Sequence, residues 1–130
     1  MPFDWGEFLI VAHGLRNDPR EGAQRTCLGR TYYYIFNLCL AKAYTIGFAG
    51  KLPGLHKQLW KWYQKSPNAT VRQMGVYGLR MYSLRIDADY RGGVIPSLAT
   101  EVKTQLSRAQ AFETLVAQSN GQTPPATLPP

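Results

Sequence analysis

The feature that most constrains this fold is a long helical pattern that begins just after Pro19 and runs to about Ile46. Apolar side chains recur through it at three- and four-residue spacings, which gives the predicted helix a wide apolar face. These side chains are Ala23, Cys27, Leu28, Tyr32, Ile35, Phe36, Cys39, Leu40 and Ala43. A helix that is apolar on most sides is expected at the centre of a domain. Gly47 and Gly50 end the pattern, and Pro53 prevents its continuation.

Four further helices are predicted from the same periodicity and from residues that cap or break helices. The first is expected to start at Asp4, with Glu7 completing a capping box, and to end before Asp18, a candidate cap for the long helix. The others are expected over residues 55–65, from the cap Asn68 to about Tyr90, and from Pro96 at a helix start to residue 118. Gly75 and Gly78 are costly inside a helix, by about 1 kcal/mol each, so they are expected where another helix approaches closely.

No strand pattern or internal repeat is present, so we predict an all-α fold, a five-helix antiparallel bundle over residues 1–118. Residues 119–130 are rich in Pro, Gln and Thr. They are predicted to form a disordered tail or an extended segment captured by a partner. Aromatic residues extend beyond one stripe on the second and third helices, which a homodimer interface would explain.

The charge balance is strongly basic, with a formal net charge of +7. This excess favours a polyanionic partner such as nucleic acid, although a basic protein without such a partner explains it equally well. Cys27 and Cys39 are about 18 Å apart along one predicted helix, too far to bridge, and are expected to be buried filler in a reducing compartment. No paired Cys and His spacing is present, so no metal and no cofactor are expected.

No apolar run approaches the roughly 20 residues that a membrane-spanning helix needs. The N-terminal residues have no basic start and contain acidic side chains early, so no signal peptide is visible. We therefore expect a cytoplasmic protein without a membrane partner.

A polar and aromatic row interrupts the long helix between Arg30 and Asn37. At about 100° per residue, these two side chains lie nearly in line, roughly 10 Å apart along the axis. Tyr33 and Tyr34 are expected to fill the same face between them. Packing alone would not select such a row, so it is predicted to be a functional site.

Two segments together resemble the HEPN family, whose name stands for higher eukaryotes and prokaryotes nucleotide-binding domain. One is Gly29–Asn37, which is similar to the family's Arg-Ala-Tyr-Tyr stretch on helix two. The other is Leu84–Tyr90, in which Arg85, Ala88, Asp89 and Tyr90 match the family's Arg-x-x-Ala-Asp-Tyr pattern. His56, which opens the third helix, also resembles a His that many members carry. The resemblance covers roughly residues 4–118.

The resemblance implies metal-independent RNA cleavage at a dimer interface, in a defence or toxin–antitoxin setting. In the family, a His seven positions after the Arg moves protons, while the Arg holds the charge that builds on the phosphorane. Here Asn37 stands in place of that His, and an amide has no titratable proton. Either His56 supplies the proton transfer together with Arg30, or the cleft of Arg30, Tyr33, Asn37 and His56 binds RNA without cutting it.

Other residues are assigned supporting or binding roles. Arg85, Asp87, Asp89 and Tyr90 are expected to support the site, and Arg30 is alternatively a structural arginine paired with Asp87 or Asp89. The expected RNA-binding surface consists of Tyr33, Tyr34, Lys57, Lys61, Arg72 and Arg80. A second hypothesis is a non-catalytic subunit that docks another protein, such as an antitoxin or an effector complex, and a third is regulatory nucleotide binding.

Overall fold

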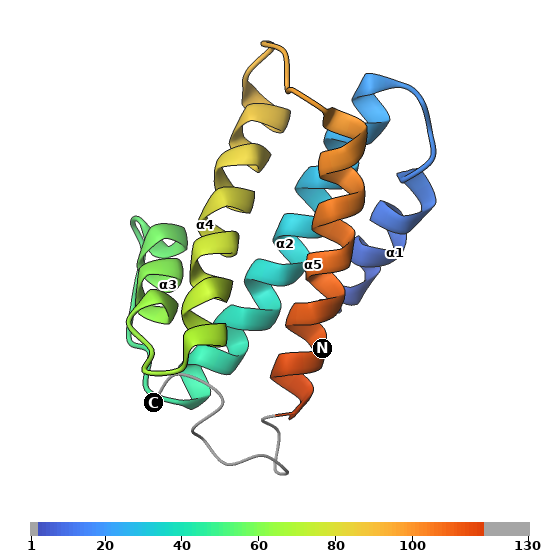
Figure 1. The fold of residues 1–130 in the computed structure, drawn as a ribbon. Helices are drawn as coiled ribbons and strands as arrows, with labels where there is room; N and C mark the ends of the chain where they lie inside the picture. Colours follow the sequence, from blue (N-terminus) through green and yellow to red (C-terminus); the bar gives the residue numbers. More distant parts are fainter. Residues whose placement is uncertain (1–2, 119–130) are drawn as a thin grey trace.

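The computed structural model describes residues 3–118, which form five α-helices (Figure 1). They are α1 (Gly6–Leu15), α2 (Glu21–Thr45), α3 (Leu55–Gln64), α4 (Ala69–Tyr90) and α5 (Leu98–Gln118). The described residues contain no strand, so the predicted all-α bundle is confirmed. The prediction for residues 119–130 lies outside the described part of the chain.

The long helix α2 is central, as its wide apolar face predicted. Helices α1, α4 and α5 each pack directly on it, and α3 packs mainly on α4 (Figure 1). Side chains along most of α2 are therefore buried: Cys27, Leu28, Thr31, Tyr32, Ile35, Phe36, Cys39 and Ala43. Different sides of α2 thus face three different helices. Polar side chains of α2 can therefore contact one another only where they lie on the same side.

The α3–α4 contact depends on two glycines, as predicted. A Cβ at Gly78 would lie 2.2 Å from the ring of Trp60, and one at Gly75 would lie 2.7 Å from the Trp60 carbonyl oxygen. Trp60 is completely buried. The helical cost of the two glycines is offset by this close approach.

The start of α4 was predicted correctly, whereas the start of α1 was not. Asn68 caps α4, and its side-chain oxygen accepts hydrogen bonds from the N–H groups of Thr70 and Val71. Helix α1 begins at Gly6, and its N-cap residue Trp5 makes no side-chain cap hydrogen bond; the Asp4 carboxylate instead accepts the N–H of Gly6, the first helical residue. The expected capping box with Glu7 is therefore wrong.

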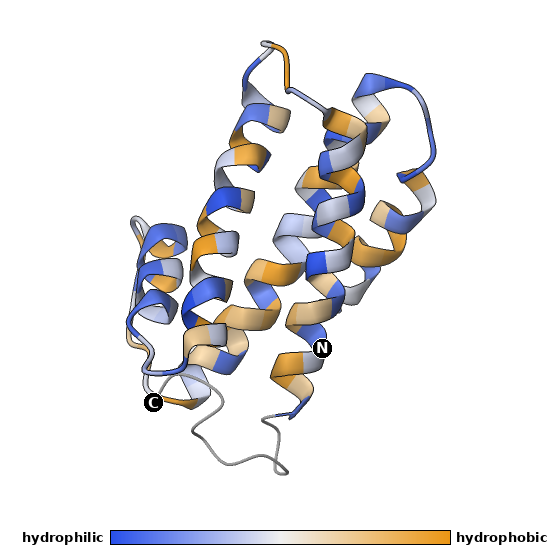
Figure 2. Cartoon of the chain, in the orientation of Figure 1, coloured by the Kyte–Doolittle hydropathy of each residue, from blue (hydrophilic) through white to orange (hydrophobic). Residues whose placement is uncertain are grey.

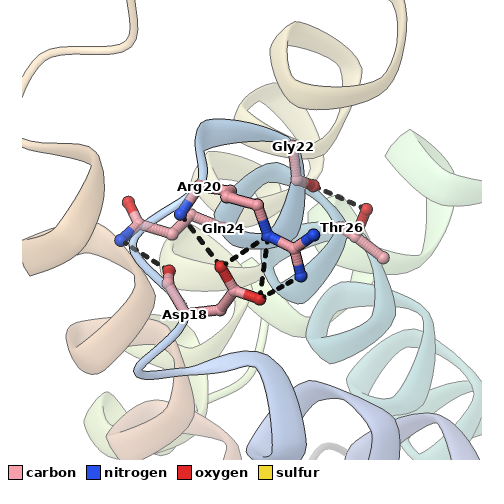
Figure 3. A network of polar contacts seen from close by, with 5 residues as sticks. All are labelled: Asp18, Arg20, Gly22, Gln24 and Thr26. Carbon is pink, nitrogen blue, oxygen red and sulfur yellow. Dashed lines mark hydrogen bonds and ion pairs between the residues drawn. The ribbon is translucent and has the colours of Figure 1, made fainter.

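Asp18 organises the turn between α1 and α2 rather than capping α2 (Figure 3). Its carboxylate accepts hydrogen bonds from the Arg20 N–H and guanidinium, while Gln24 donates to the Asp18 carbonyl oxygen. The hydrogen bonds from Arg20 lower the pKa of Asp18 to about 2. The N-cap position of α2 is Arg20, so the suggested Asp18 cap is wrong.

Of two further local predictions, the one for the cysteines is confirmed and the one for Pro96 is wrong. Cys27 and Cys39 are buried and unbridged, and burial raises the pKa of the Cys39 thiol to about 12, as expected for inert filler. Pro96 lies two residues before α5 instead of inside its first turn, and Ser97 with φ 54° carries the chain into the helix. Among residues 3–118 there is no helix of the length and apolarity that crossing a bilayer requires.

Candidate functional site

Arg30 lies in a hollow formed by α1, α2 and the C-terminal end of α4. Its guanidinium carbon is 4.6 Å from the centroid of the Phe8 ring. The hollow has a volume of about 340 Å³ and is lined by Trp5, Phe8, Arg30, Tyr33, Asp89 and Tyr90. Tyr90 is 74% exposed and Trp5 37% exposed, so aromatic surface is open to solvent around the cation. We call these six residues the Arg30 hollow.

The alternative role of Arg30, a structural ion pair with Asp87 or Asp89 of α4, is not observed. Asp87 pairs with Arg91 at 3.1 Å, and Asp89 lies 3.9 Å from Arg85. Within residues 3–118, no carboxylate lies within ion-pair distance of Arg30. Asp89 still lines the hollow, so the lining contains one carboxylate together with the Arg30 guanidinium.

Arg85 lies deeper, between α2 and α4, and is 6% exposed. Its guanidinium carbon is 4.9 to 5.9 Å from the centroids of four tyrosine rings, those of Tyr32, Tyr33, Tyr82 and Tyr90. Its buried Nε has no hydrogen-bond partner among the described residues. We call these four rings the tyrosine cage. A buried cation held by ring faces and one distant carboxylate is poorly compensated for its lost hydration.

His56 borders the tyrosine cage and is stacked against aromatic rings, with the Phe36 centroid at 3.9 Å and the Tyr82 centroid at 5.0 Å. Trp60 Nε1 donates a hydrogen bond to the Tyr32 hydroxyl oxygen, and that hydroxyl lies 2.7 Å from His56 Nδ1. Because the indole can only donate, the hydroxyl is free to give its own proton to Nδ1. When it does so, the imidazole proton is on Nε2; in the other tautomer, Nδ1–H donates to the hydroxyl oxygen.

The environment of His56 also suppresses its positive charge. Partial burial and the nearby Arg85 guanidinium lower the pKa of the imidazole to about 4. At neutral pH the ring is therefore uncharged, and Nδ1 is engaged in the hydrogen bond with the Tyr32 hydroxyl. With the proton on Nε2, the ring offers a hydrogen-bond donor, and its lowered pKa makes the imidazole a weak base for proton abstraction at neutral pH.

The structure separates the other residues of the predicted row. Asn37 donates its amide proton to the carbonyl oxygen of Tyr33 on the preceding turn of its own helix. Tyr34 lies on the α5 side of α2, where its hydroxyl donates to Glu113 Oε2 at 2.7 Å. Burial and this carboxylate raise the pKa of Tyr34. Tyr33 connects the two halves of the site, because its ring contacts those of both Phe8 and His56.

The cations of the expected basic surface differ in the contacts that they make. Lys57 and Lys61 are exposed on α3. The Arg72 guanidinium instead donates to the carbonyl oxygens of Ser66 and Pro67, and that of Arg80 pairs with Glu101 of α5 at 2.8 Å. Arg72 and Arg80 therefore also make local contacts that stabilise the fold, although both remain exposed.

Several residues of this region were missed by sequence reasoning. Phe8 and Trp5 line the Arg30 hollow, although no functional role was predicted for them. Tyr82 was detectable, because it precedes Arg85 by three residues on one helical face. Arg25 gave no local signal. Its guanidinium crosses from α2 to the end of α4 and donates to the carbonyl oxygens of Asp87, Ala88, Arg91 and Gly93.

Comparisons with known proteins place no family name on this arrangement: no family model, curated protein or solved structure matches the chain. Within residues 3–118, no group of three or more His, Cys, Asp or Glu side chains is placed to hold a metal ion. The site therefore consists of arginine, tyrosine and a neutral histidine, a set suited to holding an anion or an aromatic ring.

Proposed function

We propose that this chain is a HEPN-like RNA-binding module that holds single-stranded RNA at the Arg30 hollow without cleaving it. The observation that carries the proposal is Arg30 itself. It is a cation with no carboxylate within ion-pair distance among residues 3–118, and it lies between exposed aromatic rings. The net charge of +7 supports the same polyanionic partner.

The residue types suit the flexible, unstacked bases of single-stranded RNA. Trp5 and Tyr90 offer exposed ring faces on which bases can stack, and Arg30 offers bidentate donors to a phosphate. Lys57 and Lys61, exposed on α3, the helix that also carries His56, add positive charge that would favour a polyanion. His56 contributes a donor through Nε2–H toward a phosphate or base edge.

Binding without cleavage follows from the available proton-transfer groups. Asn37 cannot titrate, and its amide is bonded to its own helix. His56 is uncharged at neutral pH, and its Nδ1 is occupied. Activation of a ribose 2′-hydroxyl needs a base poised near the working pH. Neither side chain supplies one, so we favour the binding module over the endoribonuclease.

A homodimer remains part of the proposal. Helix α1 packs on α2 through Ala12 yet exposes 72% of Ile10 and 47% of Val11 on its other side, and much of it is coloured as hydrophobic in Figure 2. A helix that is apolar on both sides is suited to burial between two copies of the chain. Two copies would double the number of Arg30 hollows, in keeping with the dimeric organisation expected for a defence or toxin–antitoxin protein.

The proposal is tested by fluorescence anisotropy with a labelled single-stranded RNA at two salt concentrations in EDTA, with the RNA then examined on a gel. We expect binding that weakens with salt, intact RNA, and about tenfold weaker binding by Arg30→Ala. Arg16→Ala is the matched control, because Arg16 is an exposed arginine of the same charge that does not line the hollow.

Two results would contradict the proposal. Equal loss of affinity in Arg30→Ala and Arg16→Ala would mean that charge alone, not the hollow, holds the RNA. Cleavage by the wild-type chain that disappears in His56→Ala would establish the endoribonuclease instead. Asn37→His tests the reason for inactivity, because restoring a titratable side chain at this position is expected to introduce cleavage where the wild type shows none.

A further inference from the structure

An acidic side chain, that of Asp89, lines the Arg30 hollow, although the proposed partner is a polyanion. A carboxylate repels phosphate, so it weakens RNA binding unless it contacts another part of the ligand. The groups of an RNA from which a carboxylate can accept hydrogen bonds are the N–H groups of the bases and the ribose hydroxyls. The rest of the lining consists of Arg30 and the rings of Trp5, Phe8, Tyr33 and Tyr90.

The Asp89 carboxylate lies against the backbone of α2, next to Arg30. A Cβ at Gly29 would lie 3.1 Å from Asp89 Oδ1 and 3.3 Å from Oδ2, so the carboxylate packs directly on the glycine that precedes Arg30. Asp89 Oδ2 is 3.9 Å from Arg85 Nη1, which is longer than the roughly 3.2 Å limit of an N–H···O hydrogen bond. The Asp89 side chain is 32% exposed. Its oxygens can therefore accept hydrogen bonds from a ligand in the hollow.

The pattern of donors on each base decides which base a carboxylate recognises. A carboxylate accepts two parallel hydrogen bonds when a ligand presents two adjacent donors. Guanine has two such donors on its Watson–Crick edge, N1–H and the 2-amino group. Adenine and cytosine present one amino group beside a ring nitrogen whose lone pair would face the carboxylate, and uracil places its N3–H between two carbonyl oxygens. Guanine is therefore the RNA base that a carboxylate holds best.

We propose that the Arg30 hollow selects guanine and that Asp89 is its specificity-determining residue. This inference rests on the proposed function, RNA binding at the same hollow. Proteins that read single-stranded RNA stack unpaired bases on aromatic rings and hydrogen-bond the Watson–Crick edges. Here Tyr90, 74% exposed and next to Asp89 in sequence, offers a ring face, and the carboxylate accepts from N1–H and the 2-amino group. Arg30 holds the phosphate, so the cation and the carboxylate contact different parts of one nucleotide.

The test is fluorescence anisotropy of the full chain with labelled oligouridines that carry one central guanosine, inosine, adenosine or cytidine. We expect guanosine to bind about tenfold more tightly than adenosine or cytidine. Inosine keeps N1–H but lacks the 2-amino group, so it is expected to bind between them. Asp89→Asn is expected to reverse the preference toward adenosine, because an amide presents one acceptor and one donor. Glu7→Gln is the matched control: Glu7 is an exposed carboxylate of α1 that does not line the hollow, and its loss should leave the preference for guanosine unchanged.

Equal affinity for all four RNAs, with binding that still depends on Arg30, would overturn guanine selection and leave RNA binding at the hollow in place. Inosine that binds as tightly as guanosine would also overturn it, as would a preference for guanosine that survives in Asp89→Asn. A uniform rise in affinity for all four RNAs in Asp89→Asn would make the carboxylate a source of repulsion alone. If none of the RNAs binds at low salt, both this inference and the proposed function fail.

Discussion

Two arginines at the contact between α2 and α4 have similar burial and opposite surroundings. The Arg25 side chain is 12% exposed and that of Arg85 is 7% exposed. Arg25 donates to Glu21 and to four backbone carbonyl oxygens at and beyond the end of α4. Arg85 is surrounded by the tyrosine cage, has Asp89 at 3.9 Å, and leaves its Nε without a partner in the described chain.

The difference separates a structural cation from a candidate functional one. The last carbonyl groups of a helix lack intrahelical partners and carry partial negative charge, so the guanidinium of Arg25 completes the end of α4. Arg85 does not hydrogen-bond a helix end in this way, although its burial removes its hydration. Sites that break the rules of packing and hydrogen bonding in this way are typically functional. Whether the N–H donors of a buried arginine are all hydrogen-bonded therefore distinguishes a structural from a functional role better than its exposed fraction does.

Arg25→Ala is expected to give the largest effect, because it removes all of these charged hydrogen bonds at once. We expect the free energy of unfolding to fall by about 3 kcal/mol, measured by urea denaturation. Arg72→Ala is the control: Arg72 also donates to two backbone carbonyl oxygens but is exposed, and it should cost less than about 1 kcal/mol. Equal losses in the two variants would remove the basis for calling Arg25 the structural arginine.

The next largest effect expected is a pH dependence of stability that comes from His56. Its pKa is about 4 in the folded chain and about 6.5 when unfolded, so between these values the unfolded state binds the extra proton. Stability is therefore complete above pH 6.5 and falls as the pH drops toward 4. Because the ring keeps some solvent contact, we expect a loss of about 1 kcal/mol from pH 7 to pH 5 beyond that of His56→Gln. Equal losses in both proteins would contradict a suppressed imidazole.

Local signals were sufficient to predict the helices. Periodic apolar residues located all five, Asn68 located the start of α4, and Gly75 and Gly78 indicated a close helix contact that proved to involve Trp60. These predictions were confirmed because each depends on residues within one or two turns of the same helix. The capping roles predicted for Asp4 and Asp18 were wrong, because an aspartate near a helix start can accept hydrogen bonds from several nearby N–H groups.

The site was predictable only in part, because its pairings join different helices. Tyr33 and Tyr34 are neighbours in sequence, yet about 100° of rotation places one toward α1 and α3 and the other against Glu113 of α5. Periodicity cannot say which neighbour covers which side of a helix that is apolar almost all round. For the same reason, the suggested aspartate partner of Arg30 is not observed. The role of Arg25 could not be predicted either, because its backbone acceptors lie more than sixty residues further along the chain.

Arg85→Met is expected to give the smallest change in stability and is the sharpest test of the contrast with Arg25. Replacing a poorly compensated buried cation by an apolar side chain of similar volume is often neutral or stabilising, so the unfolding free energy should change by less than about 1 kcal/mol. The pKa of His56, followed by NMR titration, should rise because one of the two causes of its depression is removed. Arg91→Met is the control, because Arg91 is exposed and pairs with Asp87. A loss of stability as large as that of Arg25→Ala would make Arg85 a second structural arginine, and the tyrosine cage would then be part of the core and not of the binding site.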